Sequence, residues 1–260
     1  MKNVTLVALA LSVALAACSD SNTGTVSFAL TARQAATPAP SAAFSSTAAA
    51  PSVTATGDST LITLGNDSII IRSAQVVLRK VELKRSDVAS CDAVAGTDDC
   101  EEFETGATLV TLPLGSTTIA QQVSVAAPPG TFNALEFQIH KPSSSEDAAF
   151  IAANPDFAAI SIRVTGTYSQ AGTRSSFTFT SDVDRSQEAM LPAPATVQAG
   201  QSLSVTLRAD LSGWYLNGAK TALVDPASAN TGGANASVVA NNIQNSFNAF
   251  EDDNHDGLEG

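Results

Sequence analysis

The sequence predicts a mainly β protein, an antiparallel β-sandwich of the immunoglobulin-like or transthyretin-like kind, with one short C-terminal helix. Segments in which apolar and polar residues alternate recur along the chain, and this period of two is typical of half-buried strands. Gly- and Pro-containing turn signals separate these segments. Extended helical periodicity is confined to the last part of the chain. About eight to ten short strands are expected, which suits two packed sheets.

The first strand is expected over residues 25–33, where Val26, Phe28 and Leu30 alternate with smaller residues. Residues 34–59 form a low-complexity Pro/Ala/Ser/Thr tract that cannot bury enough apolar surface to offset the entropy of ordering it, so we expect a mobile loop or tether. The sandwich body is expected over residues 60–236.

Within the body, the Ile- and Val-rich run 68–84 predicts one long strand or two kinked strands. A hairpin is expected around the turn signal of Gly172. A short helix, capped by serines and stopped by Asn154-Pro155, is expected over 146–153. Further strands are expected at 108–112, 118–125, 132–140, 160–168, 175–180 and 203–207.

Residues 237–260 are expected to form a helix and an acidic tail. Ile243, Phe247 and Phe250 recur at helical spacing, which predicts an amphipathic helix that runs into the tail.

In the tail, Asp252, Asn254 and Asp256, followed by Gly257, match the first half of a calcium loop. The twelfth position of that loop, which normally supplies two oxygens, would fall beyond Gly260. The sequence therefore leaves two interpretations open, a weak Ca²⁺ site and a solvated acidic tail. No other cofactor is expected.

The N-terminus predicts a membrane anchor. Residues 1–17 combine Lys2 with an apolar run that is long enough for a signal peptide and short for a membrane span. Leu15-Ala16-Ala17-Cys18 resembles the bacterial lipobox, so Cys18 is expected to be acylated and residues 18–24 to form the tether. The alternative is an unmodified cysteine after an ordinary signal or anchor helix.

Ser19 follows the cysteine in place of Asp. By the sorting rule of enteric bacteria, this resembles an outer-membrane lipoprotein, so we expect the bacterial cell envelope, at the outer membrane, as the location. Lipid chains contribute about 0.8 kcal/mol per buried methylene, which is how an acylated terminus holds a domain to a membrane.

The formal charge of −12 excludes phosphate backbones as natural partners, so nucleic acid is not expected to bind. Once Cys18 is assigned to lipid, Cys91 and Cys100 remain as a pair. Outside the cytoplasm such a pair is most simply a disulfide, and a soft-metal or redox pair is the alternative.

Catalytic signatures are absent from the sequence: it contains no Gly-x-Ser-x-Gly elbow, no His-Glu-x-x-His pair and no phosphate-binding glycine loop. His140 is expected to be a polar residue at a strand end, and His255 lies in the acidic tail. The sequence therefore predicts a protein that is not an enzyme.

Several segments resemble a family of bacterial envelope lipoproteins with a β-rich domain of unknown function. The resemblance implies a location and a fold class, and it transfers no site residues. Its segments are GTVSFALT (24–31), QVVLRKVELKR (75–85), CEEFETG (100–106), GTFNALEFQIHKP (130–142), SIRVTGTY (161–168) and FTFTSD (177–182).

Two function classes remain. The first is a lipid-anchored binding or structural module whose partner is an envelope protein or a glycan. The second is a carbohydrate-binding or carbohydrate-active accessory domain. Trp214 and Tyr215 discriminate between them, because two exposed aromatic rings can stack on sugars, whereas adjacent aromatics near a strand end are more commonly core residues.

Overall fold

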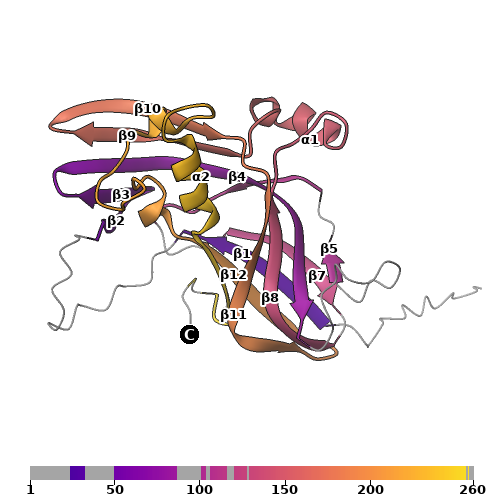
Figure 1. Cartoon of the computed structure of the whole chain (residues 1–260). Helices are drawn as coiled ribbons and strands as arrows, with labels where there is room; N and C mark the ends of the chain where they lie inside the picture. Colours follow the sequence, from indigo (N-terminus) through magenta and orange to yellow (C-terminus); the bar gives the residue numbers. More distant parts are fainter. Residues whose placement is uncertain are drawn as a thin grey trace, which may run out of the picture.

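The computed structural model describes residues 24–32, 50–86, 101–103, 106–115, 120–127, 129–255 and 257. These residues form a four-stranded sheet, in the order β13-β12-β1-β7, and a nine-stranded sheet (Figure 1). The predicted mainly β, sandwich-like fold is confirmed, and so is a short helix near the C-terminus.

The four-stranded sheet contains one parallel pair, which the antiparallel prediction did not include. Its first and third strands in chain order pair in parallel, from Thr25 opposite Ser202 to Thr31 opposite Arg208. These strands are far apart in sequence, so no hairpin turn dictates their direction. The sheet consists of β1 (Gly24–Thr31), β7 (Ala120–Ala127), β12 (Ser202–Ala209) and β13 (Phe247–Glu251).

The nine-stranded sheet is organised by β4 (Asp67–Arg85), a strand of 19 residues. Its first half pairs with β3 and β9, and its second half pairs with β5, β6 and β8. The other members are β2 (Ser52–Thr56), β3 (Ser59–Leu64), β5 (Glu101–Phe103), β6 (Thr108–Thr111), β8 (Gly130–Ile139), β9 (Ile162–Gln170), β10 (Thr173–Ser181) and β11 (Arg185–Val197).

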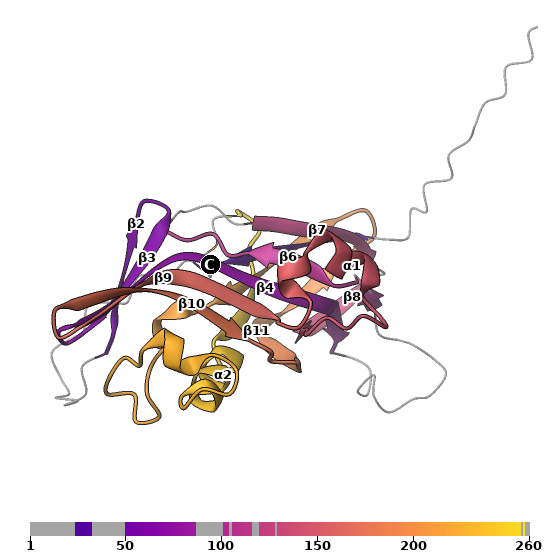
Figure 2. The ribbon, with the colours of Figure 1, turned by 90° about the horizontal axis from the view of Figure 1, so that it is seen from above.

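Of the two predicted alternatives for residues 68–84, one long strand or two kinked strands, the structure shows one strand, with an irregularity inside it. Its register with β8 shifts between Arg79 and Glu82, and Lys80 lies between them with a φ of 49°. Such a bulge bends a strand and increases its twist. Seen from above, β2, β3, β4, β9 and β10 lie side by side at one end, and β8 lies toward the other (Figure 2).

Four strands, β2, β3, β5 and β11, lie where the sequence predicted none. β2 falls inside the predicted low-complexity tract, so the sheet begins before residue 60; residues 34–49 of that tract lie outside the described residues. β11 contains Pro192 and Pro194, which cannot donate ladder hydrogen bonds. Its register with β8 shifts between Met190 and Ala195, and this irregularity accommodates both prolines.

The predicted C-terminal helix is shorter than expected. α2 spans Ala236–Gln244, and Phe247 and Phe250 belong to β13. The spacing of these two residues imitates a helical face, but pairing with β12 makes the segment a strand, in which Phe250 is 1% exposed. Within the described residues, neither helix has the length and apolar character needed to cross a bilayer.

The predicted helix over 146–153 is present as α1 (Ala148–Ala153), and it ends at Asn154 as expected. The expected serine cap is wrong: the N-cap residue is Asp147, which makes no side-chain capping hydrogen bond because its carboxylate is used elsewhere.

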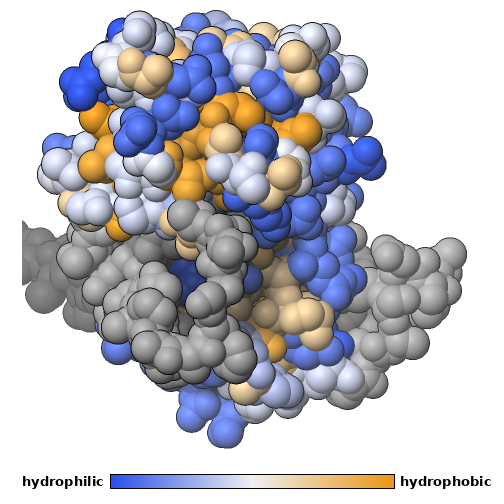
Figure 3. All heavy atoms as spheres, turned by 60° about the vertical axis from the view of Figure 1, so that its left-hand side comes forward, coloured by the Kyte–Doolittle hydropathy of each residue, from blue (hydrophilic) through white to orange (hydrophobic). Residues whose placement is uncertain are grey.

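The face in Figure 3 shows an apolar area in the upper part of the molecule with hydrophilic residues around it. Of the large hydrophobic side chains in the described residues, Met190 on β11 is the exposed one, at 59%. Apart from Met190, the large side chains in this apolar area are therefore mostly covered, and only a small part of each is exposed to solvent.

Candidate functional site

Several predicted site residues lie outside the part of the chain that the structure describes. Cys18, Cys91, Cys100 and Asp256 are among them. Acylation of Cys18 and the Cys91–Cys100 disulfide therefore stay predictions.

Trp214 and Tyr215 are core residues, so the predicted sugar-stacking platform is wrong. Both side chains are 0% exposed and offer no ring face to solvent. Trp214 Nε1 donates to Ser246 Oγ at 2.8 Å. The Tyr215 ring makes edge contacts with Phe177 and Phe179, at centroid distances of 5.9 and 5.5 Å. The alternative interpretation, two adjacent aromatics in the core, is confirmed.

Asp252 has a structural role at the start of the acidic tail. It is 2% exposed, and its Oδ2 accepts hydrogen bonds from Thr206 Oγ1 at 2.8 Å and from the Gly257 amide at 3.0 Å. Gly257 has a φ of 75°, as the sixth position of a calcium loop requires. His255 Nδ1 lies 3.1 Å from Ser204 Oγ. These contacts hold the tail against β12.

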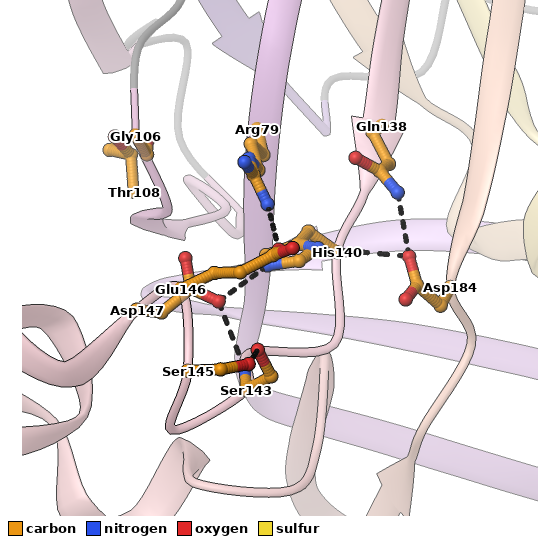
Figure 4. A network of polar contacts seen from close by, with 10 residues as sticks. All are labelled: Arg79, Gly106, Thr108, Gln138, His140, Ser143, Ser145, Glu146, Asp147 and Asp184. Atoms are coloured by element: carbon orange, nitrogen blue, oxygen red, sulfur yellow. Dashed lines mark hydrogen bonds and ion pairs between the residues drawn. The ribbon is translucent and has the colours of Figure 1, made fainter.

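The most strongly connected polar cluster surrounds His140, directly after β8 (Figure 4). His140 lies at a strand end, as the sequence predicted, but its side chain is buried, at 4% exposed. Its Nε2 lies 2.8 Å from Asp147 Oδ2, and its Nδ1 faces Asp184 Oδ1 at 3.7 Å. Its backbone amide donates to Val77 O on β4. The imidazole therefore lies between two carboxylates from different loops.

Further polar contacts complete the cluster around His140. The Ser143 amide donates to Asp147 Oδ2 at 2.9 Å, and Arg79 Nη1 pairs with Glu146 Oε2 at 2.7 Å. Burial alone would raise the pKa of Asp147, but the hydrogen bonds from the Ser143 amide and His140, together with the charge of Arg79, outweigh it and hold that pKa below its usual value.

Metal binding is one chemistry that this cluster suggests. One ligand atom each from His140, Glu146 and Asp147 lies within 4.8 Å of the others. Two contacts oppose a cation there: the guanidinium of Arg79 is bonded to Glu146, and Asp147 Oδ2 already accepts two hydrogen bonds. The cluster therefore acts as a polar clamp that joins β8, the loop before α1 and the loop after β10.

Proton transfer fits the cluster no better. Both ring nitrogens of His140 face carboxylates, and the side chain is buried, so neither nitrogen is presented to a substrate. Two features of the sequence could have identified the clamp: His140 directly follows a strand with a buried apolar face, and Asp147 comes seven residues later. Asp184 is distant in sequence and carries no local signal.

A polar pocket of about 370 Å³ lies between the end of β12 and the C-terminal end of α2. The 3₁₀ turn η3 (Leu211–Gly213) forms one wall, and its N-cap Asp210 accepts from the Ser212 amide at 2.8 Å. The sequence analysis did not identify this pocket. Its lining residues are Pro51, Asp210, Ser212, Gly213, Leu216, Lys220, Asn242, Asn245, Ser246 and Asn248.

Comparison with known proteins finds no counterpart: no family model, no curated protein and no solved structure matches this chain significantly.

Proposed function

We propose that this protein is a lipid-anchored, non-enzymatic β-sandwich of the bacterial cell envelope, at the outer membrane, and that it acts as a binding or structural module for an envelope protein or glycan. The lipobox Leu15-Ala16-Ala17-Cys18 is the observation that carries the proposal. The core strand β1 begins at Gly24, six positions after Cys18. A fully extended tether of that length spans about 20 Å, so the sandwich would lie close to the membrane.

The direction of β1 supports a binding role at the far end of the domain. β1 runs away from the tether for eight residues, about 25 Å at the usual rise of a strand. Its last residue, Thr31, is opposite Arg208, two residues before Asp210 of the polar pocket. With an anchor at Cys18, this pocket would lie on the side away from the bilayer.

Replacement of Cys18 by serine is expected to move the protein from the membrane fraction to the soluble fraction, because a hydroxyl cannot take the place of the acylated thiol. The measurement is quantitative immunoblotting of washed membranes and supernatant. The paired control Cys91→Ser/Cys100→Ser should stay with the membrane. Equal membrane retention of Cys18→Ser and the wild type would refute the anchor.

Calcium binding by Asp252, Asn254 and Asp256 is a second proposal, supported by the motif spacing and by the Gly257 turn that bonds to Asp252. Calcium at millimolar concentration is expected to raise the thermal midpoint of the wild type, because binding stabilises the folded state alone. The test variant is Asp256→Ala, because asparagine at this position would still offer a ligand oxygen, and because Asp252 also bonds Thr206. An unchanged midpoint in the wild type, or an equal rise in the variant, would exclude this site.

A further inference from the structure

We propose that the polar pocket between β12, η3 and α2 binds a neutral saccharide. The inference deepens the proposed binding role, on which it rests, by naming a site and a ligand class. The pocket volume, about 370 Å³, falls within the range of about 300–1,000 Å³ that small-molecule sites occupy. The candidate ligand is a mono- or disaccharide unit of an envelope glycan.

The charges of the lining favour a neutral ligand. Asp210 and Lys220 are the charged residues among those that line the pocket, and their formal charges cancel. The protein as a whole carries a formal charge of −12, which disfavours a phosphate or another strong anion. A ligand without net charge fits this balance best.

The asparagines supply the donors and acceptors that hydroxyl groups require. Asn242 Nδ2 donates to the carbonyls of Trp214 and Leu216, at 3.2 and 2.8 Å. Because both partners are acceptors, the orientation of this amide is fixed, and its Oδ1 is directed elsewhere. Within the described residues, no hydrogen bond occupies the Asn242 Oδ1, the Asn245 Oδ1 or the Asn248 side-chain amide. A polyol, whose hydroxyls both donate and accept, matches this set.

The walls of the pocket are pre-organised. Ser246 Oγ accepts from Trp214 Nε1 and donates to Ile243 O, so it joins the lining to the core. Lys220 has a φ of 58°, an uncommon value for a residue with a side chain. Its amide donates to Asn217 O at 2.8 Å in the turn that holds this conformation. A site built on such a frame loses little entropy when a ligand binds.

An apolar contact completes the match to a sugar ring. Leu216 and Pro51 contribute carbon surface to the lining, and Leu216 is 6% exposed. Trp214, which is the only tryptophan of the chain, is hydrogen-bonded to Ser246, and Ser246 lines the pocket. Its emission is therefore a built-in reporter of pocket occupancy.

The test uses the full-length protein in a detergent without a sugar head group, with Trp214 fluorescence and calorimetry as readouts. Glucose, N-acetylglucosamine and maltose are the probes, and acetate and inorganic phosphate are the counter-probes. We expect a saturable response to at least one sugar. Asn245→Ala and Asn248→Ala should each weaken it about tenfold or more, because each removes hydrogen bonds to the ligand.

Asn241→Ala is the matched control: this asparagine lies on α2, is exposed and does not line the pocket, so the variant should keep the affinity of the wild type. No response to any of the three sugars, binding that survives both lining variants, or saturable binding of acetate or phosphate that Lys220→Gln abolishes would each overturn the proposal. Membrane retention through Cys18 does not depend on the pocket, so a failure here is distinguishable from a failure of the anchor.

Discussion

Replacing Trp214 by alanine is expected to lower the free energy of unfolding by about 3–5 kcal/mol. The side chain is 0% exposed, and its loss leaves a large cavity beneath the turn η3. The change also leaves the buried Ser246 hydroxyl without its donor. Urea unfolding followed by far-UV circular dichroism measures the effect without relying on the removed fluorophore.

Trp214→Phe separates the two contributions to this loss. Phenylalanine keeps much of the ring volume and removes the indole N–H, so we expect a loss of about 1–2 kcal/mol. A loss below about 1 kcal/mol for Trp214→Ala would contradict the burial that excludes this residue from an exposed stacking platform.

Asp147→Ala is expected to cost about 2–4 kcal/mol, because it removes the acceptor of two buried hydrogen bonds. His140 Nε2 and the Ser143 amide would both lose their partner. The matched control is Asp156→Asn, whose exposed ion pair with Arg163 should contribute less than about 1 kcal/mol. Equal effects of the two variants would contradict the clamp.

The clamp also predicts a pH dependence of stability. The pKa of Asp147 is lower in the folded state than its usual value of 3.8, so its ionised form stabilises the fold. This contribution is present above about pH 4 and is lost as the pH falls through the folded pKa. In Asp147→Ala, the free energy of unfolding should therefore fall less steeply as the pH is lowered below about 4. Part of the fall should remain in this variant, because the pKa of Asp182 is also lowered, by Lys141 and Thr231.

Local periodicity predicted the apolar faces of β1 and β12. Their alternating apolar residues are buried, as expected, and the opposite face of β12 is buried as well, through Ser204 and Thr206; the apolar residues are Val26, Phe28 and Leu30 in β1 and Leu203, Val205 and Leu207 in β12. The parallel pairing of these two strands could not be predicted, because it depends on contacts between residues 177 positions apart in the sequence.

Long-range pairing also explains why β11 was not predicted and why β13 was predicted to be helical. Pro192 and Pro194 oppose a strand, and β11 forms because an irregularity in its pairing takes both prolines out of the ladder. Phe247 and Phe250 fit a helical face as well as a strand, and the open edge of β12 decides between the two. Tertiary pairing therefore overrode the local signal in both segments.

The candidate sites were less predictable than the strands. The clamp brings Asp184 to His140, and the pocket brings Asp210 and Lys220 to the asparagines of α2, its C-cap and β13. These residues belong to separate segments whose loops meet after folding, so no sequence spacing records them. Burial of Tyr215 likewise follows from packing against β10, and Trp214 is bonded to the distant Ser246; their position in the chain shows neither contact.

Mass spectrometry of the N-terminal peptide from membrane-extracted protein decides whether the chain is lipid-anchored. We expect a mature chain that begins at Cys18 with acyl groups on the thiol and the new amino terminus. An unmodified Cys18, within a longer chain or at its start, would contradict the lipid anchor and with it the membrane-distal position of the pocket.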